Sequence, residues 1–113
     1  MASVSNITNK VINNLGTDEQ VLATTGSNQK GACVGLSLAN VTDEIVTASV
    51  MLEDAESNKG YYIKNLRMAP QSAARVIKGG EKGLWSSNNT VSIVCDTVNG
   101  LDVIFSLVII TYA

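Results

Sequence analysis

Residues 100–113, GLDVIFSLVIITYA, are the most apolar stretch of this chain. Large apolar side chains recur at every second position from Leu101, and this period of two is typical of a β-strand that turns one face to a core. The predicted core-facing residues are Leu101, Val103, Phe105, Leu107 and Ile109. The run is too short to cross a membrane as a helix, which needs about 20 apolar residues. The sequence therefore predicts a buried strand here.

The opposite face of the same strand is also apolar. It carries Ile104, Val108 and Ile110, together with Asp102 and Ser106. Contiguous apolar patches on a protein surface usually mark interaction sites. We therefore expect either an N-terminal segment or a neighbouring subunit to cover this face, and we favour the subunit.

Two more alternating runs precede this strand. GACVGLSLAN (31–40) and IVTASVMLED (45–54) are separated by a short polar turn, which is the pattern of a β-hairpin. The first run is predicted to bury Ala32, Val34, Leu36 and Leu38, and the second Val46, Ala48, Val50 and Leu52. Further strands are predicted in QVLATT (20–25), YYIKNLRM (61–68) and TVSIVCDT (90–97), where Val91, Ile93 and Cys95 share a face.

Turn signals separate these runs, among them Pro70 and the glycine-rich KGGEKG (78–83). Short strands at about ten-residue spacing, with little helical periodicity, favour an all-β fold. We predict a single antiparallel β-sandwich of about seven or eight strands over residues 17–113. Residues 1–16 are polar and rich in asparagine, and they are predicted to form an extended N-terminal arm.

Charge and composition argue against several classes of partner. The 113 residues are 45% hydrophobic and 16% charged, with a formal net charge of −2. Nucleic-acid binding normally needs a basic face, and binding to anionic lipid needs a polybasic patch. The N-terminal residues also lack the apolar core of a secretory signal. We therefore expect no nucleic-acid partner, no membrane partner and no export by the usual route.

Residues suited to catalysis are sparse. The chain has no histidine, which removes the commonest general base and the usual zinc ligand. Three adjacent acid pairs occur in or beside predicted turns: Asp18/Glu19, Asp43/Glu44 and Glu53/Asp54. Neighbouring strand residues project to opposite faces, so these carboxylates do not converge. We predict no enzyme activity, no metal site and no cofactor.

Cys33 and Cys95 are the only two cysteines. Their separation is similar to that of the immunoglobulin inter-sheet disulfide, but Trp85 precedes the second cysteine instead of following the first. No tyrosine stands two residues before Cys95 either. We therefore expect two reduced thiols.

Much of the chain resembles a known family. VGLSLANVTDEIVTASVMLED (34–54), YYIKNLRMAPQSAARVI (61–77), a glycine loop and the final DVIFSLVIITY (102–112) are similar to the small β-sandwich virion structural proteins of tailed bacteriophages. The resemblance is a pattern of strands and turns and covers about two-thirds of the chain, from Val34 to Tyr112. The chain departs from the family pattern in having a single proline, Pro70, in its loop and in carrying Trp85.

The resemblance implies a non-enzymatic component of a phage particle, assembled in the cytoplasm of the bacterial host. Its first implied role is capsid decoration, a cement that clamps adjacent shell subunits, with the major capsid protein or other virion proteins as partners. A head–tail neck, tail or baseplate position is the alternative. A homo-oligomer is also expected.

The interface predicted for this role combines the outward face of the last strand with other apolar positions. Its residues are Ile104, Val108, Ile110, Tyr62, Trp85, Val4 and Ile7. A further alternative is a carbohydrate- or receptor-binding module. That function would need Tyr62 or Trp85 exposed beside asparagine or aspartate side chains, because sugars stack on aromatic rings and hydrogen-bond to their neighbours.

Overall fold

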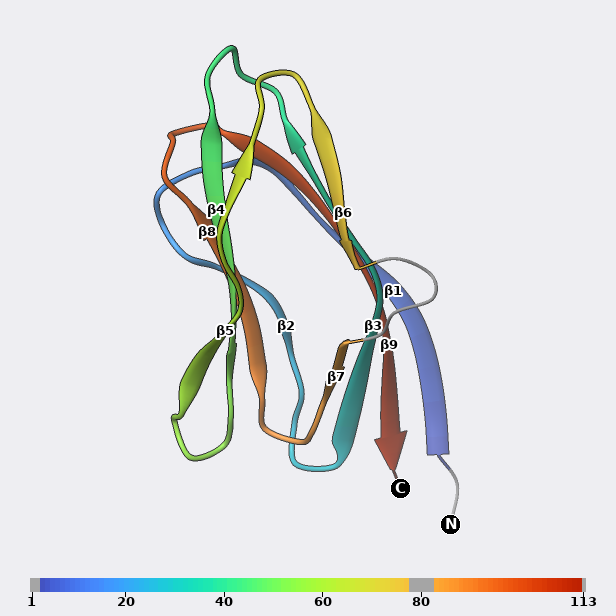
Figure 1. The fold of residues 1–113 in the computed structure, drawn as a ribbon. Coiled ribbons are helices and arrows are strands. Elements are labelled where there is room, and N and C mark those ends of the chain that lie inside the picture. The colour runs from blue at the N-terminus through green and yellow to red at the C-terminus, as the bar shows by residue number, and fades with distance from the viewer. Residues whose placement is uncertain (1–2, 78–82, 113) are drawn as a thin grey trace.

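The computed structural model describes residues 3–77 and 83–112, and within them the chain forms two facing antiparallel sheets (Figure 1). Sheet A has the strand order β1-β9-β3-β6, and β7 also pairs with β3. Its strands are β1 (Ser3–Leu15), β3 (Gln29–Asn40), β6 (Ala73–Ile77), β7 (Gly83–Trp85) and β9 (Leu101–Tyr112). Sheet B has the order β2-β8-β4-β5. Its strands are β2 (Gln20–Thr24), β4 (Val46–Glu53), β5 (Lys59–Met68) and β8 (Thr90–Cys95). The predicted antiparallel β-sandwich is confirmed.

Residues 1–16 were expected to form an extended arm, and the structure gives them a more specific place. Ser3–Leu15 is extended, but as strand β1 it pairs with β9, from Ser3 opposite Tyr112 to Leu15 opposite Leu101, with a register shift between Ile12 and Leu15. The sandwich therefore includes residues 3–15 of the segment assigned to the arm. The first and last described residues, Ser3 and Tyr112, lie side by side at one end of sheet A (Figure 1).

The core lies between the sheets and follows the predicted parity of the last strand. Leu101, Val103, Phe105 and Leu107 are all at most 4% exposed, and Ile109 packs against the core at its margin. From sheet B, the buried residues include Val46, Ala48, Val50, Val91, Ile93 and Cys95. Alternation in β4, β8 and β9 thus places one face of each strand in a shared apolar layer.

A β-bulge in β3 changes the parity predicted for that strand. The register with β9 shifts between Cys33, opposite Leu107, and Gly35, opposite Ser106. Because a bulge inserts one extra residue, every side chain beyond it turns to the other face. Leu36 and Leu38 are buried as predicted, but the assignment of Val34 and Ala32 to the core was wrong. Cys33 is buried in their place.

Asn40 closes one end of the sandwich. Its buried amide donates to the carbonyl oxygens of Glu44, Met68 and Ala69, at 2.8, 3.2 and 3.0 Å. Its side-chain oxygen accepts from the backbone N–H and the hydroxyl of Thr42. A buried polar side chain must satisfy its hydrogen bonds, and this one does so by joining the β3–β4 turn to the loop after β5.

Candidate assembly surface

The outer face of sheet A carries an exposed apolar surface made by β1 and β9. Ile7 lies opposite Val108, and Val11 lies opposite Ile104, so these four side chains project from the same face. Ile7 is 81% exposed, Val11 63% and Ile104 50%. Val108 is partly exposed, as is Ile110 two residues further along. We call Ile7, Val11, Ile104, Val108 and Ile110 the outer stripe.

Strand β3 continues this surface with small side chains. Ser37 lies opposite Ile104, Gly35 opposite Ser106, and Ala32 opposite Val108. Val34, at the bulge, is 37% exposed. Because these side chains are short, the aliphatic groups of β1 and β9 stand out beside them.

A polar row crosses the middle of the outer stripe. Ser106 donates a hydrogen bond to the side-chain oxygen of Asn9, with 2.9 Å between the two oxygens. Asn9 and Ser106 are also directly opposite in the register. The row separates Val11 and Ile104 on one side from Ile7 and Val108 on the other. This surface therefore has two aliphatic bands with a hydrogen-bonded pair between them.

Opposite charges mark the two ends of the outer stripe. Asp102, two residues before Ile104 on β9, accepts a hydrogen bond from the backbone N–H of Asn14 at 3.1 Å. Lys30 lies opposite Ile110 at the other end, with its ammonium 5.6 Å from the centre of the Tyr112 ring. The surface is thus acidic at one end, apolar in between and basic at the other.

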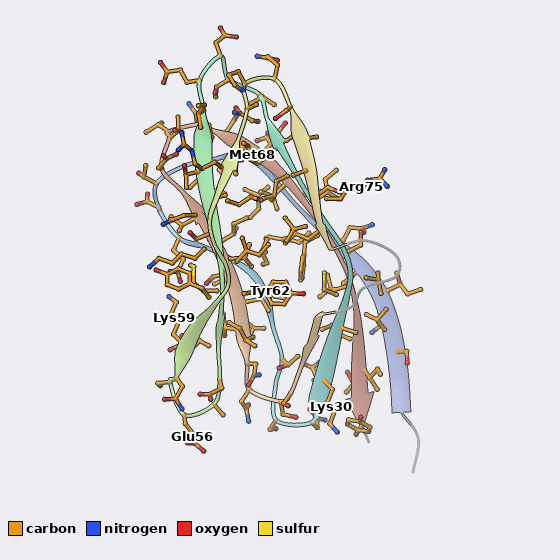
Figure 2. The ribbon with its side chains drawn as sticks, in the orientation of Figure 1. Lys30, Glu56, Lys59, Tyr62, Met68 and Arg75 are labelled. Atoms are coloured by element: carbon orange, nitrogen blue, oxygen red, sulfur yellow. The ribbon has the colours of Figure 1, made fainter. Side chains whose placement is uncertain are left out.

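Four of the seven predicted interface residues come together on this face: Ile7, Ile104, Val108 and Ile110. Val4 lies in β1 opposite Thr111, and Trp85 lies in β7 opposite Gly31. The side chains of these two are outside what the structure describes. Tyr62 belongs to β5 in the other sheet and points into the space between the sheets, so it lies apart from the outer stripe (Figure 2).

Val11 belongs to the surface but was missed from the sequence. It has the same parity as Ile7, four residues earlier, and this spacing was the available signal. This spacing did not indicate a shared surface, because the residues of an unpaired arm have no fixed inner and outer faces. Only pairing with β9 gives the two residues a common side.

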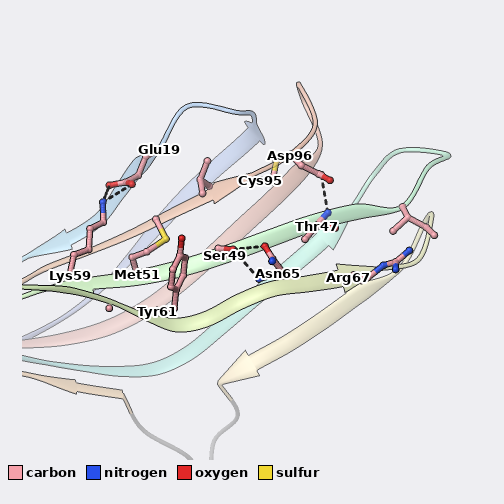
Figure 3. Close-up of a pocket in the computed structure, with 13 residues that line it drawn as sticks. Glu19, Thr47, Ser49, Met51, Lys59, Tyr61, Asn65, Arg67, Cys95 and Asp96 are labelled. Atoms are coloured by element: carbon pink, nitrogen blue, oxygen red, sulfur yellow. Dashed lines mark hydrogen bonds and ion pairs between the residues drawn. The ribbon is translucent and has the colours of Figure 1, made fainter.

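The outer face of sheet B is different: it forms a polar groove of about 960 Å³ (Figure 3). Thr47, Ser49 and Met51 of β4 form its floor, between β5 on one side and the residues around Glu19 and Asp96 on the other. Ser49 and Met51 are only 8% and 5% exposed although they point away from the core. Side chains of the chain itself therefore cover this face.

Hydrogen bonds inside the groove join several of its polar groups. The Asn65 backbone N–H donates to the Ser49 hydroxyl at 3.0 Å, where a bulge gives Asn65 a φ of 54°. The Lys59 ammonium donates to the Glu19 carboxylate at 2.7 Å, which lowers the pKa of Glu19 and raises the pKa of Lys59. The Thr47 backbone N–H donates to Asp96 at 2.9 Å and lowers the pKa of that carboxyl.

Tyr61 is the aromatic residue that this groove presents. It is 58% exposed, and the Lys64 ammonium lies 5.0 Å from the centre of its ring. Asn65 and Arg67 line the same groove. The saccharide-binding alternative required Tyr62 or Trp85 as such a ring, and β5 instead places the neighbouring Tyr61 in the groove.

Both cysteines are free and buried. The Cys95 thiol lies 3.3 Å from the Leu15 carbonyl oxygen and 3.1 Å from that of Thr97, so it joins the end of β1 to the turn after β8. Burial raises the pKa of Cys95 and of Cys33, which keeps both groups in the protonated, unreactive form.

Residues 3–77 and 83–112 contain no group of three or more acidic or cysteine side chains placed to hold a metal ion. In the same residues, no helix has the length and apolar character needed to span a membrane.

No protein-family model matches this chain, and no curated protein matches it either. Its structure is similar to that of a protein from Bacillus endospore appendages, which form disulfide-linked pili; the TM-score is 0.58 at 11% identity, covering 96% of this chain and 87% of that one. It is also similar to a protein of the T13 IBDV viral particle, with a TM-score of 0.51 at 8% identity. That match covers 96% of this chain but 31% of the viral one. At such identities the likeness establishes the fold alone.

Proposed function

We propose that this chain is a non-enzymatic structural subunit of a virion, in which the outer stripe of sheet A binds a neighbouring subunit. The observation that carries the proposal is the exposure of Ile7, Val11 and Ile104 side by side on one sheet face. Covering an aliphatic side chain of this size stabilises a complex by up to about 1.5–3 kcal/mol. A monomer gains none of this energy, whereas an assembly does.

The fold agrees with a structural role. Similar sandwiches occur in a pilus of Bacillus spores and in the T13 IBDV particle, both of which are assemblies of protein subunits. Among virion components we favour capsid decoration, because a small sandwich can occupy the shell in many copies and contact a neighbouring copy or shell subunit through this face. A neck, tail or baseplate ring would use the same face.

The location can be tested on the parent particle. Heads and tails are separated, and this chain is quantified in each fraction by mass spectrometry relative to the major shell protein. Hundreds of copies on heads support decoration. A few dozen copies with necks or tails would move the chain to a ring or baseplate, and absence from both fractions would overturn the virion proposal.

The surface can be tested with a matched pair of variants. Val108→Lys places a charge in the outer stripe and is expected to prevent incorporation into particles while the free protein remains folded. Val98→Lys is the control, because Val98 is 69% exposed in the turn between β8 and β9, away from the stripe. Equal incorporation of both variants would exclude the stripe as the contact surface.

The groove of sheet B favours saccharide binding as a second candidate function. It presents the exposed Tyr61 ring beside the hydrogen-bonding side chains of Asn65 and Arg67. Aromatic rings with polar neighbours are the usual combination for holding a sugar ring. On a glycan array, Tyr61→Ala is expected to lose any signal and Tyr62→Ala to keep it. No signal from the unaltered protein would remove this candidate.

A further inference from the structure

We infer that the partner seated on the outer stripe is a second copy of this chain, packed face to face with its strands antiparallel. This inference rests on the surface used in the proposed function and names its occupant. It follows from the order of side chains along the stripe: an aliphatic pair lies on each side of the polar row, and the two ends carry opposite charges, Asp102 at one and Lys30 beside Ile110 at the other.

The pairing register of β1 with β9 shows this order of side chains. Ser106 and Asn9 form the central row; Ile104 and Val11 lie two residues to one side, and Val108 and Ile7 two residues to the other. A two-fold axis through the central row, perpendicular to the strands and in the plane between the copies, exchanges the two sides. It places Ile104 over the second copy's Val108 band, so each aliphatic band meets another.

The charges are complementary under the same operation. Lys30 lies opposite Ile110 at one end of the sheet, and Asp102 lies opposite Ala39 at the other. The two-fold axis brings the Lys30 end of one copy over the Asp102 end of the other. The small Ala39 side chain leaves room for the ammonium to approach the neighbouring carboxylate, and the pairing occurs twice because the interface is isologous.

A face-to-face contact also agrees better with β1 than an edge-to-edge contact. β1 lies at the edge of sheet A, but its Lys10 is opposite Phe105 and shares the face that looks toward the other sheet. Inward-facing lysine on an edge strand is a device that opposes the addition of another strand. The aliphatic residues of β1 point out of the sheet instead, where a facing copy can cover them.

The size of the surface sets the expected strength. From Asp102 to Ile110 the stripe is about 27 Å long, and three strands make it about 15 Å wide. The contact therefore buries about 800 Å² over both copies, below the roughly 1,200–2,000 Å² of a stable complex. Isolated chains should therefore associate weakly into pairs.

The test is a charge-reversal cycle on the purified protein. Self-association is measured by sedimentation equilibrium up to millimolar concentration in low salt, for the unaltered chain, Lys30→Glu, Asp102→Lys and the double variant. Each single variant brings like charges together and is expected to weaken association about tenfold or more. The double variant restores opposite pairs and is expected to return to within about threefold of the unaltered chain.

Methyl NMR provides a second readout that does not depend on the charged residues. On dilution of the unaltered protein, the methyl signals of Ile7, Val11, Ile104 and Val108 should shift, and that of Val98 should not. Thermal unfolding of each variant verifies that it is folded.

Two results would overturn the inference. A chain that stays monomeric at every concentration has a different protein as its partner, and a double variant as weak as the single ones excludes the antiparallel arrangement. If either result is found while Val108→Lys still prevents incorporation into particles, the proposed function stands without homotypic pairing.

Discussion

The two outer faces of this sandwich come from the same alternating strand pattern but meet water in different ways. On sheet B, Met51 and Ser49 are almost fully buried, because Tyr61, Asn65 and the Glu19–Lys59 pair enclose the groove. On sheet A, no equivalent side chains of the described residues cover Ile7 or Ile104. One outer face is therefore covered by side chains of the chain itself, whereas the other stays exposed to solvent.

The largest expected difference in stability is between substitutions on the two faces of strand β9. Phe105→Ala should lower the free energy of unfolding by about 3–5 kcal/mol, because Phe105 is 1% exposed at the centre of the core. Ile104→Ala, one residue away on the outer stripe, should change it by less than about 0.5 kcal/mol. Urea denaturation of the monomer measures both. A large loss from Ile104→Ala would mean that the outer stripe contributes to folding.

The next comparison sets the outer faces of the two sheets against each other. Met51→Ala should cost about 2 kcal/mol, since it removes a side chain that is buried although it points away from the core. Ile7→Ala should be nearly neutral, because 81% of Ile7 already meets solvent. Thermal unfolding of the two variants distinguishes a covered face from an open one, and equal midpoints would contradict that distinction.

Ser49→Ala tests the internal hydrogen bonding of the groove. It leaves the Asn65 backbone N–H without its 3.0 Å acceptor at a bulge with positive φ. Loss of one partly buried hydrogen bond should lower stability by about 1 kcal/mol. On sheet A, Ser106→Ala removes the more exposed bond to Asn9 and should cost less. Calorimetric unfolding of the two variants measures which substitution lowers stability more.

Acid should weaken the sheet B face by a small amount. The Lys59 ammonium lowers the pKa of Glu19, and the Thr47 N–H lowers that of Asp96. The folded pKa of each group lies below its unfolded value of about 4.5 or 3.8, so their contribution is complete above these values and is lost as pH falls through the folded pKa. Solvent screening limits it to about 1 kcal/mol or less.

The measurement is the free energy of unfolding between pH 5 and pH 2 for the unaltered chain, Asp96→Asn and Glu19→Gln. Both variants should show a shallower loss of stability than the unaltered chain. A steeper loss of stability in either variant would contradict the lowered pKa of the carboxyl that it removes.

The faces of β9 could be predicted, because its polar residues Asp102 and Ser106 share one parity and leave the large apolar residues from Leu101 to Leu107 on the other. The same reasoning was wrong for Val34, since no local signal marks the bulge beside Gly35. It also left residues 1–16 as an arm, because an Asn-rich segment with polar residues on both faces has no pattern that requires pairing. Tyr61 was missed for a similar reason: the bulges in β5 decide which of two adjacent tyrosines faces the groove.

The local sequence pattern therefore determined the all-β class, which residues of β4, β8 and β9 face the core, and the presence of a second apolar face. These depend on side-chain periodicity, which neighbouring residues carry. The outer stripe, by contrast, was decided by tertiary structure. Ile7 and Val11 join Ile104 and Val108 only when β1 pairs with a strand some 90 positions further along the chain, and register between distant strands is set by the energy of the whole sheet.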